Sequence, residues 1–129
     1  MGMAYAHSEA GQHDEAIAAV NKLFPPGQAV PPDEFGFRAL AFLASEYEQA
    51  GKAADGAVRF RELLLGRPAD ERTAELLILL EDRAGKVDQA VAAGRAFLAQ
   101  NPEAHRLRLV MAGLLEKANR RRSGLETGQ

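Results

Sequence analysis

Few residues in this chain have the type and spacing that catalysis or metal binding requires. Of its three histidines, His7 and His13 lie six residues apart, whereas two metal ligands on one helical face stand four apart. We expect both of these side chains to face solvent or to lie in turns. The chain has no cysteine, which excludes disulfides, thiolate nucleophiles and cysteine-based zinc sites.

Other motifs of cofactor binding and nucleophilic catalysis are missing as well. The two Gly-Lys pairs lack both the upstream glycine and the following Ser or Thr of a phosphate-binding loop. No serine stands in the context of a nucleophile elbow; the serines are Ser8, Ser45 and Ser123. The sequence therefore predicts no enzyme, no cofactor and no metal.

One set of chemically capable residues does recur at a regular interval. Arg38, Arg72 and Arg106 are spaced 34 residues apart. At 100° per residue, Arg38 points almost directly away from the apolar stripe formed by Leu40 and its helical neighbours. The interval predicts a row of arginines that occupy the same place in successive units.

The same interval relates residues that end helices. It separates Gly51 from Gly85, Pro68 from Pro102 and Leu43 from Leu77. One further step leads from Gly85 to Asn119, which we expect to close a helix in the left-handed conformation. Gly11 lies 40 residues before Gly51, and the six extra residues fall in the proline-rich segment 24–33.

Each unit is predicted to hold two helices. In the segment 33–50, Leu40, Leu43, Ala44 and Tyr47 show the spacing of one helical stripe. A glycine ends this helix, and a partner helix follows over residues 53–65. The next pair is expected at 69–84 and 87–100, and an unpaired last helix at 105–119. No segment alternates with the period of a strand.

The pattern resembles the tetratricopeptide repeat. Its best match is the middle unit, which has Leu40, Leu43, Ala44, Tyr47, Gly56, Phe60 and Pro68 at the positions of the family signature. The third unit departs from the signature at Ile78, which is not small, and at Glu81, which is not aromatic. Small residues recur where two helix backbones approach: Ala16, Gly56 and Ala90.

The resemblance implies an all-α fold of seven antiparallel helices, stacked as a short right-handed superhelix (an α-solenoid). The repeat domain is expected to cover residues 1–119, and a polar C-terminal tail residues 120–129. Within the domain the units are expected at about 1–28, 35–68, 69–102 and 103–119. Because no hairpin can bury its apolar face alone, stacking must supply the core.

The resemblance also implies a function. In this family the outer strip of the first helices lines a concave groove that holds a peptide or helix of a partner protein. The arginines in such a groove could bind carboxylates through paired N–H donors. The residues expected to line it are Arg38, Ser45, Gln49, Arg72, Glu75, Leu79, Arg83, Arg106 and Leu109. Ala41 and Ser45 stand where the chaperone-binding members carry Lys and Asn, which argues against a chaperone-tail clamp.

A purely structural reading of the arginines is also open. Glu34 and Arg38 form an i, i+4 pair, and Glu75 and Glu103 each lie three residues from an arginine. Such pairs contribute about 0.2–0.5 kcal/mol each to a helix. Local pairing alone would therefore account for surface arginines at these positions.

An alternative function is a structural subunit that self-associates through its terminal helices. The last predicted helix has no partner behind it, and Leu107 and Leu114 are the residues expected to mediate a homo-oligomer. An RNA-binding helical repeat is disfavoured by the formal net charge of −2.

The partner is therefore expected to be a protein or peptide, with no nucleic acid and no membrane insertion. No run of residues approaches the length and apolarity of a membrane span. The absence of a recognisable signal peptide favours the cytoplasm over the periplasm.

Overall fold

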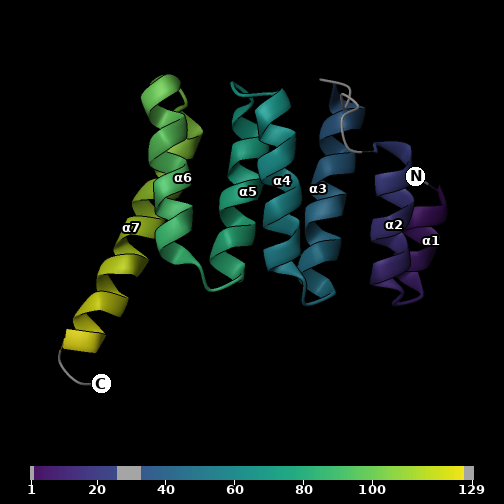
Figure 1. Cartoon of the computed structure of the whole chain (residues 1–129), viewed down its shortest axis with the longest axis horizontal. Helices are drawn as coiled ribbons and strands as arrows, with labels where there is room; N and C mark the ends of the chain where they lie inside the picture. The colour runs from purple at the N-terminus through teal and green to yellow at the C-terminus, as the bar shows by residue number, and fades with distance from the viewer. Residues whose placement is uncertain (1, 26–32, 127–129) are drawn as a thin grey trace.

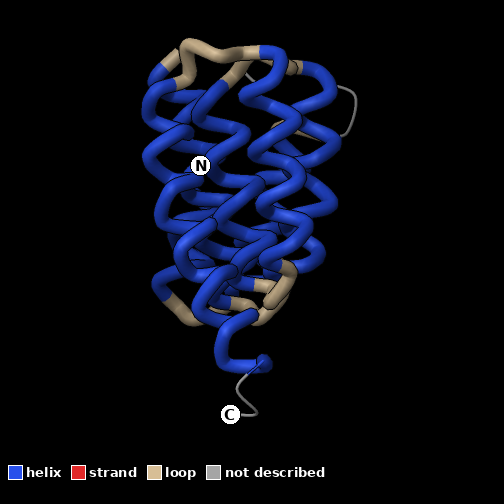
Figure 2. Tube along the Cα trace, turned by 90° about the vertical axis from the view of Figure 1, so that its left-hand side faces the viewer, coloured by secondary structure: helices blue, strands red, loops and turns tan. Residues whose placement is uncertain are grey.

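The chain folds as a row of helices that stand side by side (Figure 1). A computed structural model describes residues 2–25 and 33–126, with side chains as far as Arg121. These residues form seven helices and no strand (Figure 2), which confirms the predicted all-α class. The helices are α1 (Gly2–Glu9), α2 (His13–Leu23), α3 (Glu34–Gln49), α4 (Ala53–Gly66), α5 (Glu71–Arg83), α6 (Val87–Gln100) and α7 (His105–Glu126).

A glycine ends the first helix of three of the two-helix units, namely α1, α3 and α5, as the spacing predicts. Gly11, Gly51 and Gly85 have φ angles of 77°, 72° and 77°, in the left-handed region that a side chain disfavours. After α5, the N–H of Gly85 donates to the carbonyl of Asp82, and the N–H of Lys86 donates to that of Glu81. Equivalent hydrogen bonds close α1 and α3. Each turn therefore satisfies the helix carbonyls while the chain reverses into the next helix.

The starts of α3, α5 and α7 are capped by carboxylates. Asp33 accepts a hydrogen bond from the N–H of Gly36, and Asp70 accepts one from the N–H of Arg72. Ala104 occupies the corresponding place before α7 and has no side-chain acceptor. Glu71 supplies it from α5, since its carboxylate accepts from the N–H of Leu107 at 3.1 Å. The start of α7 is thereby tied to the preceding unit.

The core consists of two clusters that meet at α5. Leu77 and Leu80 of α5 belong to the cluster built from α1 to α5, whereas Ala74 and Ile78 belong to the cluster shared with α6 and α7. α3 packs against α5, and α5 against α7, so these three helices also form a layer of their own. The small positions serve close approach, because a Cβ at Gly56 would lie 2.8 Å from Tyr47 Cβ.

The last helix departs from the prediction. α7 continues through Asn119 to Glu126, and in the described residues only glycines have positive φ. Asn119 therefore does not end a helix, and residues 120–126 of the predicted tail are helical. An asparagine inside a helix costs less than about 0.7 kcal/mol relative to alanine, so one residue does not impose a turn. The predicted insertion falls largely on residues 26–32, which lie outside the described residues.

Candidate functional site

The predicted groove residues lie together on the layer formed by α3, α5 and α7. All are exposed except Glu75, which is partly buried. They come from three helices that run in the same direction, because one antiparallel helix lies between each and the next along the chain. We call this surface the odd-helix face; its residues are Arg38, Ser45, Gln49, Arg72, Glu75, Leu79, Arg83, Arg106 and Leu109.

The arginines of this face already have carboxylate partners within the chain. Arg38 pairs with Glu34 at 3.4 Å, as the local spacing predicts. Arg72 pairs with the same glutamate at 3.7 Å, and its guanidinium lies 4.2 Å from the centre of the Phe37 ring. The row is therefore not a set of free cations waiting for carboxylates from a partner.

Two of the predicted local pairs are replaced by pairs between helices. Arg106 binds Glu75 of α5 at 2.9 Å, in place of Glu103 on its own helix. Because Glu75 of α5 is paired with Arg106, Arg72 of α5 forms its ion pair with Glu34 of α3. Parallel neighbouring helices bring these charges together, whereas sequence spacing shows only partners on the same helix.

A second row of ion pairs crosses the same helices nearer their carboxyl ends. Glu48 of α3 binds Arg83 of α5 at 3.3 Å, and Asp82 of α5 binds Lys117 of α7 at 2.8 Å. The two pairs are related by the 34-residue interval, since Glu48 corresponds to Asp82 and Arg83 to Lys117. Exposed pairs of this kind contribute only modestly to stability. They nevertheless leave these four side chains already paired when another molecule approaches this surface.

Neutral residues separate the two rows. Ser45 of α3 and Leu79 of α5 are exposed there, and Gln49 donates to the Ser45 hydroxyl at 2.9 Å. On α7 the same zone holds Leu109, which is 76% exposed, and Gly113, where a Cβ would have no heavy atom within 4 Å. The odd-helix face thus has a neutral centre, with open space over α7, between two rows of neutralised charge.

The predicted self-association residues are not on the surface. Leu107 is completely buried and Leu114 is 6% exposed, and both belong to the core cluster of α5, α6 and α7. The prediction is wrong for these two residues because they lie on the side of α7 that packs against α5 and α6. The side available to another molecule carries other residues of this helix.

Two buried carboxylates have no counterpart in the sequence-based expectations. Glu46 and Glu81 are each 1% exposed. His13 Nδ1 lies 2.8 Å from Glu46 Oε2, within hydrogen-bond distance, so this histidine is partly buried and does not simply face solvent. Arg61 binds Glu81 at 3.0 Å, while burial raises the pKa of the Glu81 carboxyl above its ordinary value.

Each of these carboxylates is bound through its Oε2 atom, Glu46 to His13 and Glu81 to Arg61. In each, the second oxygen is buried without a hydrogen-bond partner. Glu81 occupies the position that Tyr47 holds one unit earlier, so its departure from the repeat signature was the available signal. The described residues contain no group of three or more side chains that could hold a metal ion.

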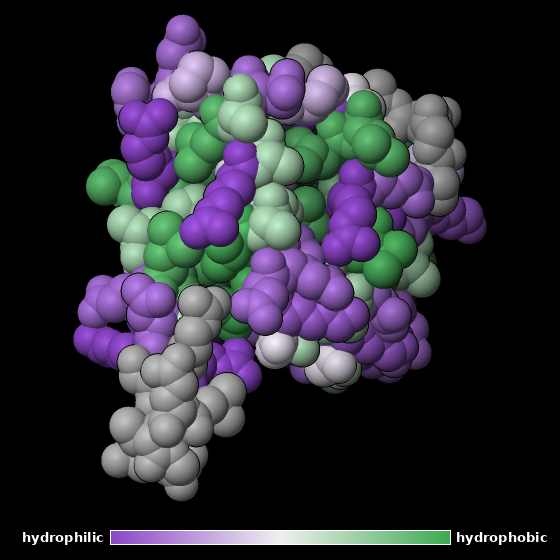
Figure 3. All heavy atoms as spheres, turned by 60° about the vertical axis from the view of Figure 1, so that its left-hand side comes forward, coloured by the Kyte–Doolittle hydropathy of each residue, from purple (hydrophilic) through white to green (hydrophobic). Residues whose placement is uncertain are grey.

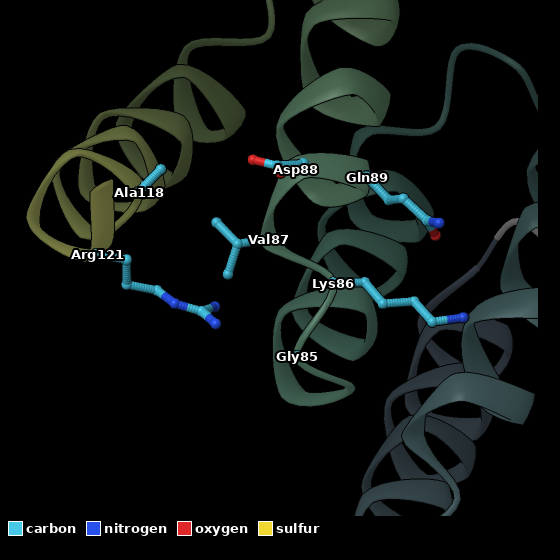
Figure 4. Close-up of a pocket in the computed structure, with 7 residues that line it drawn as sticks. All are labelled: Gly85, Lys86, Val87, Asp88, Gln89, Ala118 and Arg121. Carbon is cyan, nitrogen blue, oxygen red and sulfur yellow. The ribbon is translucent and has the colours of Figure 1, made fainter. Parts of the chain in front are cut away.

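Three hollows lie within the part of the chain that the structure describes, and their lining residues differ in character. One of about 370 Å³ lies between the α5–α6 turn and α7. Figure 4 shows Arg121 and Ala118 on the α7 side of it, whereas the Lys86 and Gln89 side chains extend away from that helix. A second, of about 420 Å³ at the starts of α3 and α5, is bordered by the Arg67–Asp70 ion pair at 3.1 Å.

A third hollow of about 620 Å³ is mainly apolar and lies between α4 and α6. Its floor includes Leu77 of α5, and Leu65 at its edge is 81% exposed. Figure 3 shows the end of the molecule that carries α6 and α7, where hydrophobic side chains are interspersed among hydrophilic ones. No helix in the described residues is both long and apolar enough to cross a membrane.

Comparison with protein-family models, with curated proteins and with solved structures finds no match to this chain. The tetratricopeptide resemblance rests on the 34-residue spacing of the sequence. What the structure adds is the all-helical architecture and the placement of the repeated residues on one layer.

Proposed function

We propose that this chain is a non-catalytic interaction module of tetratricopeptide type, which binds a helix or extended peptide of another protein on its odd-helix face. The observation that carries the proposal is the neutral zone between two rows of cross-helix ion pairs. A partner can bury the neutral centre without stripping water from an unpaired charge, which would be costly. We also propose that the stacked helix pairs follow a right-handed superhelix.

The placement of charge changes the mechanism expected from the sequence. Arg72 and Arg106 are already bound to carboxylates. Affinity for the partner must therefore come mainly from apolar contact with Leu79 and from close approach of the partner to the α7 backbone at Gly113, which has no side chain. The paired charges at the border then favour one register of the partner over others, because misplaced charges would meet like charges.

The experiment places charge in the neutral zone. A double Ser45→Glu, Leu79→Glu variant is compared with the intact chain in affinity capture, with bound proteins identified by mass spectrometry. The matched control is Val58→Glu, on the exposed side of α4, where Val58 is 62% exposed. We expect the intact chain and the control to retain the same partners and the double variant to lose them.

Identical capture by all three proteins would contradict the proposal. Circular dichroism of each variant confirms that the fold is intact before the capture results are compared. Reversal of the three arginines is a weaker test, because it would place new carboxylates beside Glu34 and Glu75 and disturb the fold itself.

A further inference from the structure

The side of α7 that faces away from α5 and α6 corresponds to a buried surface one unit earlier. Ala74 and Ile78 of α5 are 1% and 2% exposed beneath α6 and α7. Their counterparts 34 residues later, Arg108 and Ala112, are exposed. We call this surface the open face of α7; it consists of the exposed residues Arg108, Leu109, Ala112, Glu116 and Asn119. Leu115 lies at its border, half-buried against the core cluster of α5, α6 and α7.

Charge on this face continues a series that the preceding helices complete internally. Glu48 binds Arg83 of the next odd-numbered helix, and Asp82, one interval later, binds Lys117. Glu116 is the third member of the series. Among the described residues its ion-pair partner is Arg120, one turn along the same helix at 2.6 Å. Glu48 and Asp82 each form an ion pair with another helix. Their counterpart Glu116 is instead exposed at the open face of α7.

The distribution of residues on this face is self-complementary. Arg108 lies four residues before Ala112, and Glu116 lies four residues after it. If two copies of α7 pack antiparallel with Ala112 at the crossing point, Arg108 of each copy stands beside Glu116 of the other. Leu109 of each copy then stands opposite the half-buried Leu115 at the border of the other. A parallel arrangement would instead bring like charges together.

We propose that the open face of α7 binds the same face of a second copy of this chain, as an antiparallel helix pair about a twofold axis at Ala112. A symmetric interface of this kind uses one patch on both subunits and closes after two copies. The small Ala112 side chain allows the helices to approach closely, and Leu109, which is 76% exposed, supplies apolar area.

A single helix pair makes a small interface, so the dimer is expected to be weak and to depend on protein concentration. The odd-helix face and the open face of α7 share Leu109, but the test of partner binding changes residues of α3 and α5 alone. The groove variant at Ser45 and Leu79 leaves α7 unchanged and should dimerise like the intact chain. Failure of one proposal can therefore be told from failure of the other.

Charge reversal tests the antiparallel register directly. Arg108→Glu gives a face with two acids, and Glu116→Arg gives a face with two bases. In each variant both intersubunit contacts become repulsive, and we expect dimerisation to weaken about tenfold or more. An equimolar mixture of the two variants should form a heterodimer, because each acid then meets a base. The double variant with both reversals should dimerise like the intact chain.

Sedimentation equilibrium over a range of concentrations measures each of these masses. Lys22→Glu on α2, at the opposite end of the row (Figure 1), is the matched control and should leave dimerisation unchanged. The proposal is overturned if the intact chain stays monomeric up to about 1 mM. It is equally overturned if the single reversals leave the dimer intact, or if mixing them restores nothing. Circular dichroism establishes that every variant is folded.

Discussion

Replacing Gly56 with alanine tests the close packing of α3 against α4. The new Cβ would lie 2.8 Å from both Cβ and Cγ of Tyr47. These atoms adjoin the α3 backbone, so rotation of the ring cannot relieve the overlap and the two helices must separate. Overpacking of this kind costs about 1–3 kcal/mol, while alanine in place of glycine inside a helix gains about 0.5–1 kcal/mol. We expect a net loss of about 1 kcal/mol in the free energy of unfolding.

Gly113→Ala provides the matched control, because its Cβ would meet no heavy atom within 4 Å. The helix-propensity gain is common to both substitutions, so the difference between them isolates the cost of overpacking. We expect Gly113→Ala to stabilise the chain by about 0.5–1 kcal/mol. Urea unfolding followed by circular dichroism, at low protein concentration, measures both values. If Gly56→Ala proves as stable as Gly113→Ala, α3 and α4 do not approach as described.

Three further substitutions probe the turns, the caps and the buried charge. Gly85→Ala should cost about 1–2 kcal/mol in urea unfolding, since its φ of 77° disfavours a Cβ; unchanged stability would refute a left-handed turn there. Glu71→Ala removes the acceptor for the Leu107 N–H and should cost about 0.5–2 kcal/mol, with faster amide exchange at Leu107 than elsewhere in α7 as the decisive readout. Because burial raises the pKa of Glu81 above its unfolded value of 4.5, the stability that its protonated form contributes is present below that pH and is lost as pH rises through the folded pKa. Relative to Glu81→Gln, the intact chain should therefore lose stability from about pH 4.5 upward, and parallel pH profiles in urea unfolding would contradict this assignment.

The elements of the fold that follow from local chemistry were predictable from the sequence. Gly51 and Gly85 mark turns because only glycine adopts their φ without strain. The second helix of the third unit was predicted at residues 87–100 and is observed as α6, Val87–Gln100. The spacing of Arg38 and Arg72 placed both on one layer, because equal intervals give equivalent positions in equivalent helices.

Features that depend on contacts between helices were not predictable in this way. Asn119 could have ended α7, and nothing in its neighbourhood shows that the helix continues to Glu126. Leu107 reads as a surface residue of an unpaired helix until the packing of α7 on α5 is known. The partner of Glu75 likewise depends on which arginine the next helix brings within reach.

The division of the core at α5 has a consequence for how the chain loses its structure. Leu77 and Ile78 are adjacent in sequence, yet they belong to different clusters. A substitution that destabilises the cluster of α6 and α7 can therefore unfold that end of the chain while α1 to α4 remain folded. Native-state hydrogen exchange should then show two cooperative unfolding units. In each unit the backbone amides of α5 should be the last to exchange.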